Sequence, residues 1–293
     1  MDLPETFLAH GRRGPDWQAW IDGVPRLLRD LTDEWDLTVD GTPRHGFAAL
    51  VVPVLTRAGV QAALKVGWVE PETEHEALAL QRWDGDGAVR LLRADPRRGA
   101  LLLERLGEPL STRDAIEACE VVAGLYGRLH RPAGPPLRPL SGFVGRWTDD
   151  LAALDHDPRL PRRYVDQAIH LGRAFAADPG TDGRMIHGDL HDENVLASDR
   201  GWLAIDPHAM SGDPHYEVAP LLWNRWDEVV ASGDVRREVR LRFHTTIDAA
   251  GLDEDRARDW IVVREAFNAL WAIEDGSLDE LTVAIAVIKA VQE

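Results

Sequence analysis

A polar segment and the two short apolar runs that follow it constrain the fold of this chain more than any other feature. Residues 185–194 read MIHGDLHDEN, and residues 202–208 read WLAIDPH. Between and within them, the apolar runs VLA and WLAI are separated by SDRG, a turn sequence typical of two antiparallel strands. If the turn centres near Arg200, Asn194 and Asp206 face each other at the open end of the hairpin, within about one residue of register. Two oxygen ligands are therefore expected to converge there.

A zinc site is one interpretation of this segment. His187 and His191 have the i, i+4 spacing of the zinc motif H-E-x-x-H. That motif requires a helix with a glutamate directly after the first histidine, whereas Gly188 follows His187 and a hairpin comes soon afterwards. The sequence therefore disfavours a zinc hydrolase, which remains the alternative from another class of enzyme.

Phosphoryl transfer is the second interpretation. Asp189 and Asn194 have D-x-x-x-x-N spacing, in which the aspartate orients the attacking hydroxyl and accepts its proton while the asparagine binds magnesium. Asp206 would complete the metal site, because magnesium prefers oxygen ligands and shares them with the nucleotide phosphates. The spacing thus predicts Asp189 as the catalytic base of an ATP-dependent kinase, with Asn194 and Asp206 as ligands of Mg²⁺.

Lysine is rare in this chain, which contains only Lys65 and Lys289 among 33 lysine and arginine residues. Lys65 lies in AALKV, a sequence typical of a strand, and a kinase needs a lysine that reaches the nucleotide phosphates. A carboxylate on the next helix, best Glu76 and otherwise Glu72, would hold its ammonium group by an ion pair. The alternative is an edge-strand lysine whose stem lies along apolar surface.

Hydrophobic periodicity divides the chain into a strand-rich part and a helical part. A helix, three strands, a helix and two strands are expected at residues 15–35, 37–41, 47–55, 60–66, 72–83, 88–92 and 100–106. The following segment STRD predicts a helix start with Ser111 and Asp114 as a capping box. We therefore predict an α+β fold with two lobes. Residues 1–106 form a small five-stranded antiparallel lobe with one main helix, and residues 107–293 form a larger, mostly helical lobe.

Net charge and the length of the apolar stretches indicate which kinds of partner this chain can bind. The net charge of −17 disfavours nucleic acid, whose phosphates require basic patches, and would attract a cationic ligand. No apolar stretch reaches the roughly 20 residues that a membrane span needs, so we expect a cytoplasmic protein with no membrane partner. The single cysteine, Cys119, lies in a helix-like segment and is expected to be a buried, inert thiol.

Several motifs together resemble one known family. HGDLHDEN, AIDP, AALKV, LLLERL and YGRLHRP resemble the aminoglycoside phosphotransferases, which are similar in fold to protein kinases. The segments LVVPVL, RWDGDGAVRLL, WLAIDP, GDP and LWAIEDG are most similar to the branch that contains streptomycin 6-phosphotransferases and hydroxyurea phosphotransferases. The resemblance extends from about residue 15 to about residue 280, which is most of the chain.

The resemblance also implies roles for residues that spacing alone does not assign. It implies that Lys65 contacts the ATP phosphates and that Asp206 stands in for the aspartate of the kinase D-F-G triplet, here DPH. The backbone from Glu104 to Leu106 would hydrogen-bond adenine. The segment expected to cover the phosphates, residues 40–50, offers only two glycines and so departs from the Gly-rich pattern.

The acceptor is expected to contact the C-terminal part of the chain. Residues 259–276 have helical character and end in Glu274 and Asp275. Carboxylates near a helix C-terminus oppose the helix dipole, which favours a compensating cation. That cation is either an arginine of the protein or a guanidinium or ammonium group of the substrate. Further candidates for acceptor contacts are Glu265, Asn268 and Asp213.

The leading hypothesis is an ATP-dependent, Mg²⁺-dependent kinase that phosphorylates a hydroxyl of a small, cationic, sugar-like molecule such as streptomycin. Two alternatives share its fold: a metabolic sugar or amino-sugar kinase, and a homologue that binds nucleotide without turnover. A monomer or a weak dimer is expected. The presence of every catalytic part in the expected order favours an active enzyme.

Overall fold

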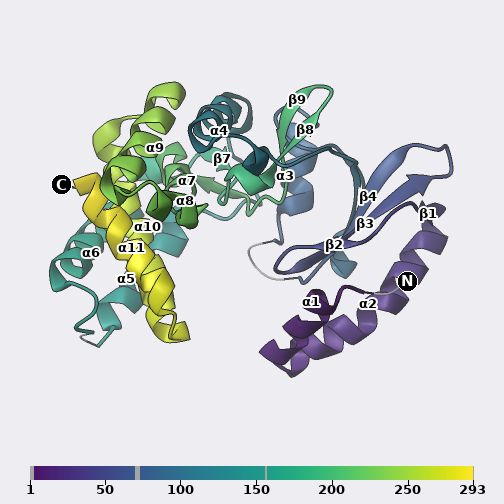
Figure 1. Ribbon diagram of the computed structural model, residues 1–293, viewed down its shortest axis with the longest axis horizontal. Coiled ribbons are helices and arrows are strands. Elements are labelled where there is room, and N and C mark those ends of the chain that lie inside the picture. Colours follow the sequence, from purple (N-terminus) through teal and green to yellow (C-terminus); the bar gives the residue numbers. More distant parts are fainter. Residues whose placement is uncertain (1–2, 70–72, 156, 293) are drawn as a thin grey trace. The chain divides into compact units, whose positions relative to one another are not determined.

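The computed structural model describes residues 3–69, 73–155 and 157–292. The chain divides into two compact units, one ending at Gly107 and the other beginning at Glu108 (Figure 1). This division lies one residue from the expected lobe boundary between residues 106 and 107.

The first unit contains a six-stranded antiparallel sheet with the strand order β1-β3-β4-β6-β5, in which β2 pairs with β3. The strands are β1 Leu37–Val39, β2 Arg44–His45, β3 Ala49–Thr56, β4 Gln61–Gly67, β5 Leu91–Asp95 and β6 Ala100–Glu104. The prediction of five strands was therefore wrong by one. The sixth strand, β2, has only two residues and no apolar alternation that a sequence pattern could show.

One long helix packs on this sheet. The helices of the first unit are α1 Glu5–Leu8, α2 Pro15–Glu34 and α3 Glu76–Trp83. In α2, which begins with proline at its first position, Ile21, Val24, Leu28 and Leu31 form one buried face. That face joins the inward-facing residues of β3 and β4 in a single apolar cluster, with α2 drawn in purple along the sheet in Figure 1.

The second unit is mostly helical. Its helices are α4 Ala115–Leu129, α5 Leu140–Ala153, α6 Arg162–Ala177, α7 Pro220–Trp223, α8 Trp226–Ala231, α9 Val235–Ala250, α10 Glu254–Asp275 and α11 Leu278–Gln292. Two small antiparallel pairs complete it: β7 Arg184–Ile186 with β10 Met210–Gly212, and β8 Val195–Ser198 with β9 Gly201–Ala204. Two short 3₁₀ turns, η5 Asp192–Asn194 and η6 Pro214–Val218, flank these strands.

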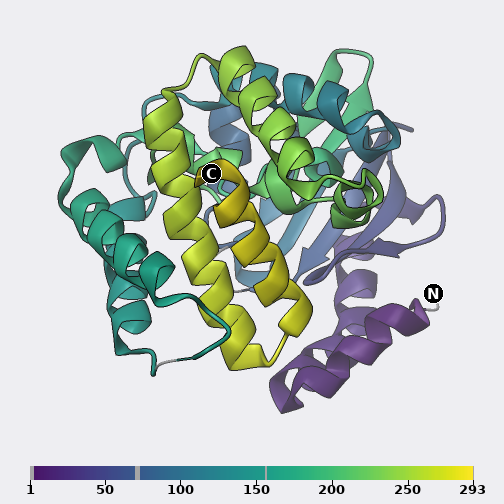
Figure 2. The same cartoon turned by 60° about the vertical axis from the view of Figure 1, so that its left-hand side comes forward.

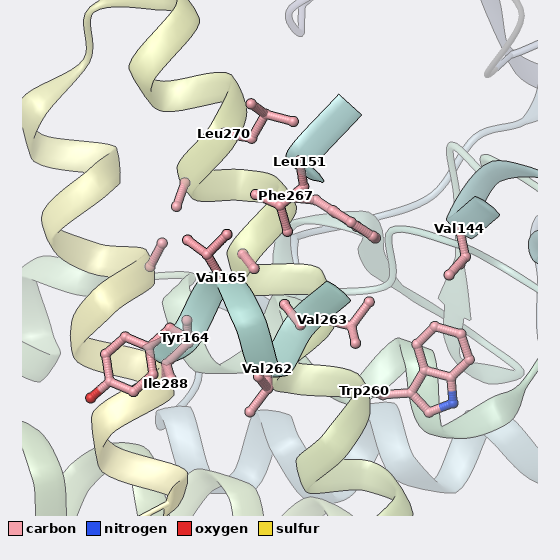
Figure 3. Close-up of a cluster of buried hydrophobic side chains, with 14 of the residues drawn as sticks. Val144, Leu151, Tyr164, Val165, Trp260, Val262, Val263, Phe267, Leu270 and Ile288 are labelled. Atoms are coloured by element: carbon pink, nitrogen blue, oxygen red, sulfur yellow. The ribbon is translucent and has the colours of Figure 1, made fainter. Parts of the chain in front are cut away.

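Helix α10 is the centre of this unit. It is buried on nearly all sides from Ala257 to Leu270, and its buried residues include the charged Arg264 and Glu265. Figure 3 shows its side chains, among them Trp260 and Phe267, packed with residues of α5 and α6. In Figure 2, α10 and α11 lie side by side, in yellow-green and yellow. A helix buried in this way holds its polar residues in fixed positions.

Two expectations about single features can be checked against the fold. Cys119 is buried in α4, and burial raises the pKa of its thiol to about 11, so it is an inert thiol as predicted. None of the described helices is long and apolar enough to cross a membrane.

Candidate active site

The hairpin β8–β9 brings Asn194 close to Asp206. Val195 pairs with Ala204, and the next residue outward, Asn194, accepts a hydrogen bond through its carbonyl from the N–H of Ile205 at 2.9 Å. Asp206 follows directly, with a left-handed φ of 59°. The predicted register, in which Asn194 faces Asp206 within one residue, is confirmed.

Asp189 lies in the loop of residues 187–194, between β7 and β8, which we call the Asp189 loop. Its side chain is 31% exposed, with Nε2 of His191 at 3.6 Å and Nη2 of Arg264 at 3.8 Å from its two carboxylate oxygens. Burial alone would raise the pKa of this carboxyl, but its interaction with the nearby His191 ring and the positive charge of Arg264 outweigh burial and lower it. Asp189 is therefore ionised at neutral pH and able to accept a proton.

The side chain of Asn194 is oriented by the same loop. Its Nδ2 donates to the backbone carbonyl of Asp189 at 2.9 Å and lies 3.1 Å from Nε2 of His191. Because the amide nitrogen is used within the loop, the amide oxygen Oδ1 is directed elsewhere. An amide oxygen and the carboxylate of Asp206 are suitable ligands for a hard cation such as Mg²⁺.

The arrangement of His187 excludes it from a zinc site. Its Nε2 lies 2.8 Å from the carbonyl oxygen of Ile205, and its Nδ1 accepts the N–H of Asp189 at 3.3 Å. Both ring nitrogens are thus used within the protein, and burial lowers the pKa of the ring so that it stays neutral. The described residues hold no group of three or more His, Cys, Asp or Glu side chains placed to bind a metal. The zinc alternative has no support in this geometry.

Sequence reasoning missed a buried carboxylate that supports the Asp189 loop. Glu217, on η6, accepts the N–H of Gly188 at 2.7 Å through Oε1 and contacts Nε2 of His130 through Oε2. The hydroxyl of Tyr126 donates to its backbone carbonyl at 3.0 Å. Burial would raise the pKa of Glu217, but the hydrogen bond and charge of His130 lower it below its usual value. A glutamate within an apolar segment, HYEVAP, was the only signal in the sequence.

In the first unit, Lys65 and Glu76 form the expected ion pair. Nζ of Lys65 lies 2.7 Å from Oε1 of Glu76, and both residues are only 6% exposed. Strand β4 lies between β3 and β6, so Lys65 is not on an edge strand and that alternative was wrong. Glu72, the second candidate, lies outside the described residues.

The segment expected to bind adenine follows β6. The carboxylate of Glu104 accepts the N–H of Arg90 at 2.8 Å, and its own N–H donates to the carbonyl of Arg90 at 3.1 Å. Among the described residues, no hydrogen bond uses the backbone groups of Leu106. Within that part of the chain, these groups therefore have no hydrogen-bond partner.

The candidate acceptor residues lie in different environments. Asp213 is buried, and its carboxylate accepts hydrogen bonds from Nε1 of Trp260 at 2.7 Å and Nε of Arg256 at 2.6 Å. Asp213 is also the N-cap of η6, and its carboxylate accepts a hydrogen bond from the N–H of His215 at 3.0 Å. Asp213 therefore compensates Arg256 within the protein, and nothing in this arrangement presents it to an acceptor.

Glu265 and Asn268 lie on adjacent turns of α10. Glu265 is 1% exposed, and burial raises its pKa to about 8, although Asn268 and Arg264 partly oppose this shift. Nδ2 of Asn268 donates to Oε2 of Glu265 at 3.3 Å, whereas Oε1 has no hydrogen-bond partner among the described residues. A buried polar atom without a partner requires an explanation, such as a bound ligand.

Glu274 and Asp275 are exposed at the C-terminal end of α10, before Gly276, which has a left-handed φ of 72°. In the part of the chain that the structure describes, neither carboxylate forms an ion pair with an arginine. The compensating cation expected from the protein is thus not present there. Trp271, 37% exposed, lies one turn earlier on the same helix.

Comparisons with known proteins identify the family of this chain. Residues 34–276 match the family described as aminoglycoside/hydroxyurea antibiotic resistance kinase. The chain is 42% identical to a streptomycin 6-kinase of Streptomyces glaucescens, over 98% of this chain and 96% of the relative. It is 40% identical to a hydroxyurea phosphotransferase of Kitasatospora aureofaciens, over 98% of this chain and 84% of the relative.

Solved structures show the same fold at low sequence identity. The aminoglycoside phosphotransferase APH(4)-Ia superposes with a TM-score of 0.61 at 16% identity, covering 92% of this chain and 98% of that structure. A putative fructosamine-3-kinase from Thermobifida fusca has a TM-score of 0.56 at 18% identity, covering 90% and 97%. The fold is thus the two-lobed, protein-kinase-like α+β fold that the sequence predicted. With the family match over most of its length, the chain belongs to the aminoglycoside/hydroxyurea antibiotic resistance kinases.

Proposed function

We propose that this protein transfers the γ-phosphate of ATP to a hydroxyl of a small cationic sugar-like molecule, an aminoglycoside such as streptomycin. The observation that carries the proposal is Asp189, an ionised and partly exposed carboxylate on a loop whose backbone and neighbouring amide are held in place. Relatives named streptomycin 6-kinase, 42% and 41% identical over 98% of the chain, support the substrate class.

In this mechanism Asp189 orients the acceptor hydroxyl and accepts its proton as the oxygen attacks the γ-phosphorus, and the bond from that phosphorus to the β,γ-bridging oxygen breaks so that ADP leaves. The remaining contribution of the protein is positioning and charge neutralisation, without a covalent enzyme intermediate. Asn194, through Oδ1, and Asp206 would hold Mg²⁺, which when bound supplies positive charge to the phosphates.

The first unit would bind the nucleotide. Lys65, oriented by its ion pair with Glu76, would contact the phosphates. Glu104 would offer its carbonyl to adenine, since its N–H donates to Arg90, and Leu106 would offer its backbone groups. The lack of a hydrogen-bond partner for Leu106 among the described residues supports its role. The second unit, which holds the Asp189 loop, would bind the acceptor.

Four residues of α10 would contact the cationic groups of the acceptor. Among the residues that the structure describes, Glu274 and Asp275 are exposed carboxylates without a counter-ion, and Glu265 has one carboxyl oxygen without a hydrogen-bond partner. Asn268 lies between them along the helix. Asp213 is left out of this set, because Arg256 and Trp260 occupy its carboxylate.

The test is an ATP-consumption assay with streptomycin, other aminoglycosides, neutral sugars, amino sugars and hydroxyurea, in which phosphorus NMR identifies the new phosphate ester. We expect turnover with a guanidinium-bearing or amine-bearing aminoglycoside. The Asp189→Asn variant, which keeps the size of the side chain, is expected to lower turnover by about two to four orders of magnitude. Turnover with simple sugars alone would favour a metabolic kinase.

Hydroxyurea is the second candidate acceptor, since the hydroxyurea phosphotransferase is 40% identical over 98% of this chain. Hydroxyurea carries no positive charge, so its phosphorylation would not need Glu274 or Asp275. Turnover with hydroxyurea and not with any aminoglycoside would contradict the cationic acceptor and retain the kinase.

A further inference from the structure

The backbone of Gly188, the residue that precedes Asp189, is held by two hydrogen bonds, one at its N–H and one at its carbonyl. The N–H of Gly188 donates to Oε1 of Glu217 at 2.7 Å, and its carbonyl accepts Nη2 of Arg264 at 2.9 Å. Gly188 has a φ of +87°, and a Cβ at this position would lie 2.6 Å from the carbonyl oxygen of His208. Only glycine fits here, and its two backbone polar groups have buried charged partners.

Arg264 is itself fixed before any ligand binds. It projects from the buried helix α10 and is 8% exposed. Its Nη1 donates to the carbonyl of Tyr216 at 3.0 Å, and its guanidinium lies 4.2 Å from the ring centre of Tyr216 and 5.1 Å from that of Trp223. A planar group held by two hydrogen bonds and two aromatic faces has little rotational freedom left.

The hydrogen bonds of Arg264 go to main-chain carbonyls rather than to the nearby carboxylate. Nη2 lies 2.9 Å from the oxygen of Gly188 but 3.8 Å from Oδ1 of Asp189, which is longer than a hydrogen bond. Arg264 therefore fixes the backbone at Asp189 and adds a favourable charge without occupying the oxygen that must accept a proton. A guanidinium in direct bidentate contact would compete with the acceptor hydroxyl for that oxygen.

We propose that Arg264 is the positioning residue of Asp189: by binding the carbonyl of Gly188, it sets the direction in which the Asp189 carboxylate meets the acceptor hydroxyl. The inference rests on the proposed function, in which Asp189 is the base. It adds a residue that no sequence motif indicated, since Arg264 lies 76 positions after the carbonyl it binds.

Two substitutions of Arg264 test this role. Arg264→Lys keeps the charge but cannot reach the carbonyls of Gly188 and Tyr216 together. Arg264→Gln removes the buried charge, keeps a donor, and provides a second variant if the lysine form does not fold. Because a displacement of about 1 Å can lower turnover about 100-fold, we expect kcat to fall about 10- to 100-fold in both variants. The KM values for ATP and for the acceptor should change by less than about threefold.

Arg258 is a matched control on the same helix. Its Nε donates to the carbonyl of Val291 at 2.8 Å, and its guanidinium is also paired with acidic residues of the first turn of α10. Arg258→Lys should lower the Tm without changing kcat. If Arg264 were only structural, its variants would likewise lower the Tm and leave the kcat of the folded enzyme unchanged, which would overturn the proposal.

A double-mutant cycle with Asp189→Asn separates positioning from direct contact. If Arg264 acts through Asp189, Arg264→Lys should change the residual turnover of Asp189→Asn by less than about twofold, because the group it orients is already lost. Additive losses, with a raised KM for ATP, would mean that Arg264 contacts phosphate directly and would overturn the inference while keeping the kinase. Full turnover in Asp189→Asn alone would overturn the proposed function as well.

Discussion

Asp189 and Glu265 are two carboxyl residues in one unit whose surroundings shift their pKa values in opposite directions. Arg264 favours the charged form of both. Asp189 also has His191 and a partly exposed side chain, so its pKa falls. Glu265 is buried, and the one hydrogen bond to its carboxyl group from a described residue is the long one from Asn268, so burial dominates and its pKa rises to about 8. One carboxyl is thus ready to accept a proton, and the other is held neutral until a cation approaches it.

The raised pKa of Glu265 predicts a pH-dependent loss of stability. Between pH 4.5 and about 8, the unfolded chain releases the Glu265 proton while the folded protein keeps it. The unfolded state then binds fewer protons, so the free energy of unfolding falls as pH rises, by at most about 1.4 kcal/mol per pH unit from this group. Glu265→Gln should remove this contribution. Urea unfolding at pH 5 to 8 should therefore show the variant gaining stability over the wild type as pH rises, and a constant difference would contradict the prediction.

The two lysines of the chain allow the same substitution to be made at a site residue, Lys65, and at a control residue, Lys289. Lys65 is buried and paired with Glu76, whereas Lys289 is exposed on α11. Lys65→Arg should raise the KM for ATP and lower kcat, because a planar guanidinium cannot occupy the site of a compact ammonium, and overpacking should cost about 1–3 kcal/mol of stability. Lys289→Arg should change neither. Equal activity of both variants, measured by ATP turnover and thermal unfolding, would remove the assigned role of Lys65.

At the scale of elements, sequence patterns correctly predicted structure that depends on contacts between residues close in the chain. The β8–β9 hairpin and its register followed from two apolar runs and a turn sequence. The start of α4 was placed wrongly: Ser111 lies in a 3₁₀ turn, and Asp114 is the N-cap that accepts the N–H groups of Ile116 and Glu117. Aspartate after a short turn caps as well as serine does, and the sequence pattern did not distinguish them.

The supports of the site could not be predicted in the same way. Asp189, Asn194 and Asp206 lie in one local segment whose spacing carries information. Glu217 and Arg264 bind Gly188 across separations of 29 and 76 residues, and both are charged residues within mainly apolar stretches that match no motif. Their partners depend on how α10 and η6 pack, which no periodicity encodes.

Alanine substitutions at two glycines of the second unit distinguish the cost of backbone strain from the cost of a steric clash. Gly188 and Gly201 both have positive φ, +87° and +95°, but only at Gly188 would a Cβ meet an atom, the His208 oxygen at 2.6 Å. Gly201→Ala, at the start of β9, should cost about 1–2 kcal/mol of stability with unchanged kcat. Gly188→Ala should cost more and also lower kcat, since it displaces the Asp189 loop. Equal Tm values and equal turnover in the two variants would contradict this account of the loop.

For the whole molecule, the net charge of −17 and the exposed acids at the C-terminal end of α10 both favour a cationic acceptor. Glu274 and Asp275 are exposed, so their attraction for an acceptor should be screened by salt. We therefore expect the acceptor KM to rise with ionic strength while the KM for ATP changes less. The salt dependence of the two KM values is measured on the wild-type protein and reports the attraction of all its charges for the acceptor, not a single contact.

Charge-neutral variants locate that attraction on the surface. Glu274→Gln and Asp275→Asn should raise the acceptor KM and reduce its salt dependence, with little change of kcat at saturation, because they remove ground-state binding remote from the transferred phosphoryl group. Glu120→Gln, which removes one exposed charge from α4, alters the net charge equally and should leave the acceptor KM unchanged. If Glu120→Gln has the same effect as the α10 variants, the attraction comes from net charge alone. If no variant and no salt concentration changes the acceptor KM, the acceptor is not held by its positive charge, and α10 is not its binding surface.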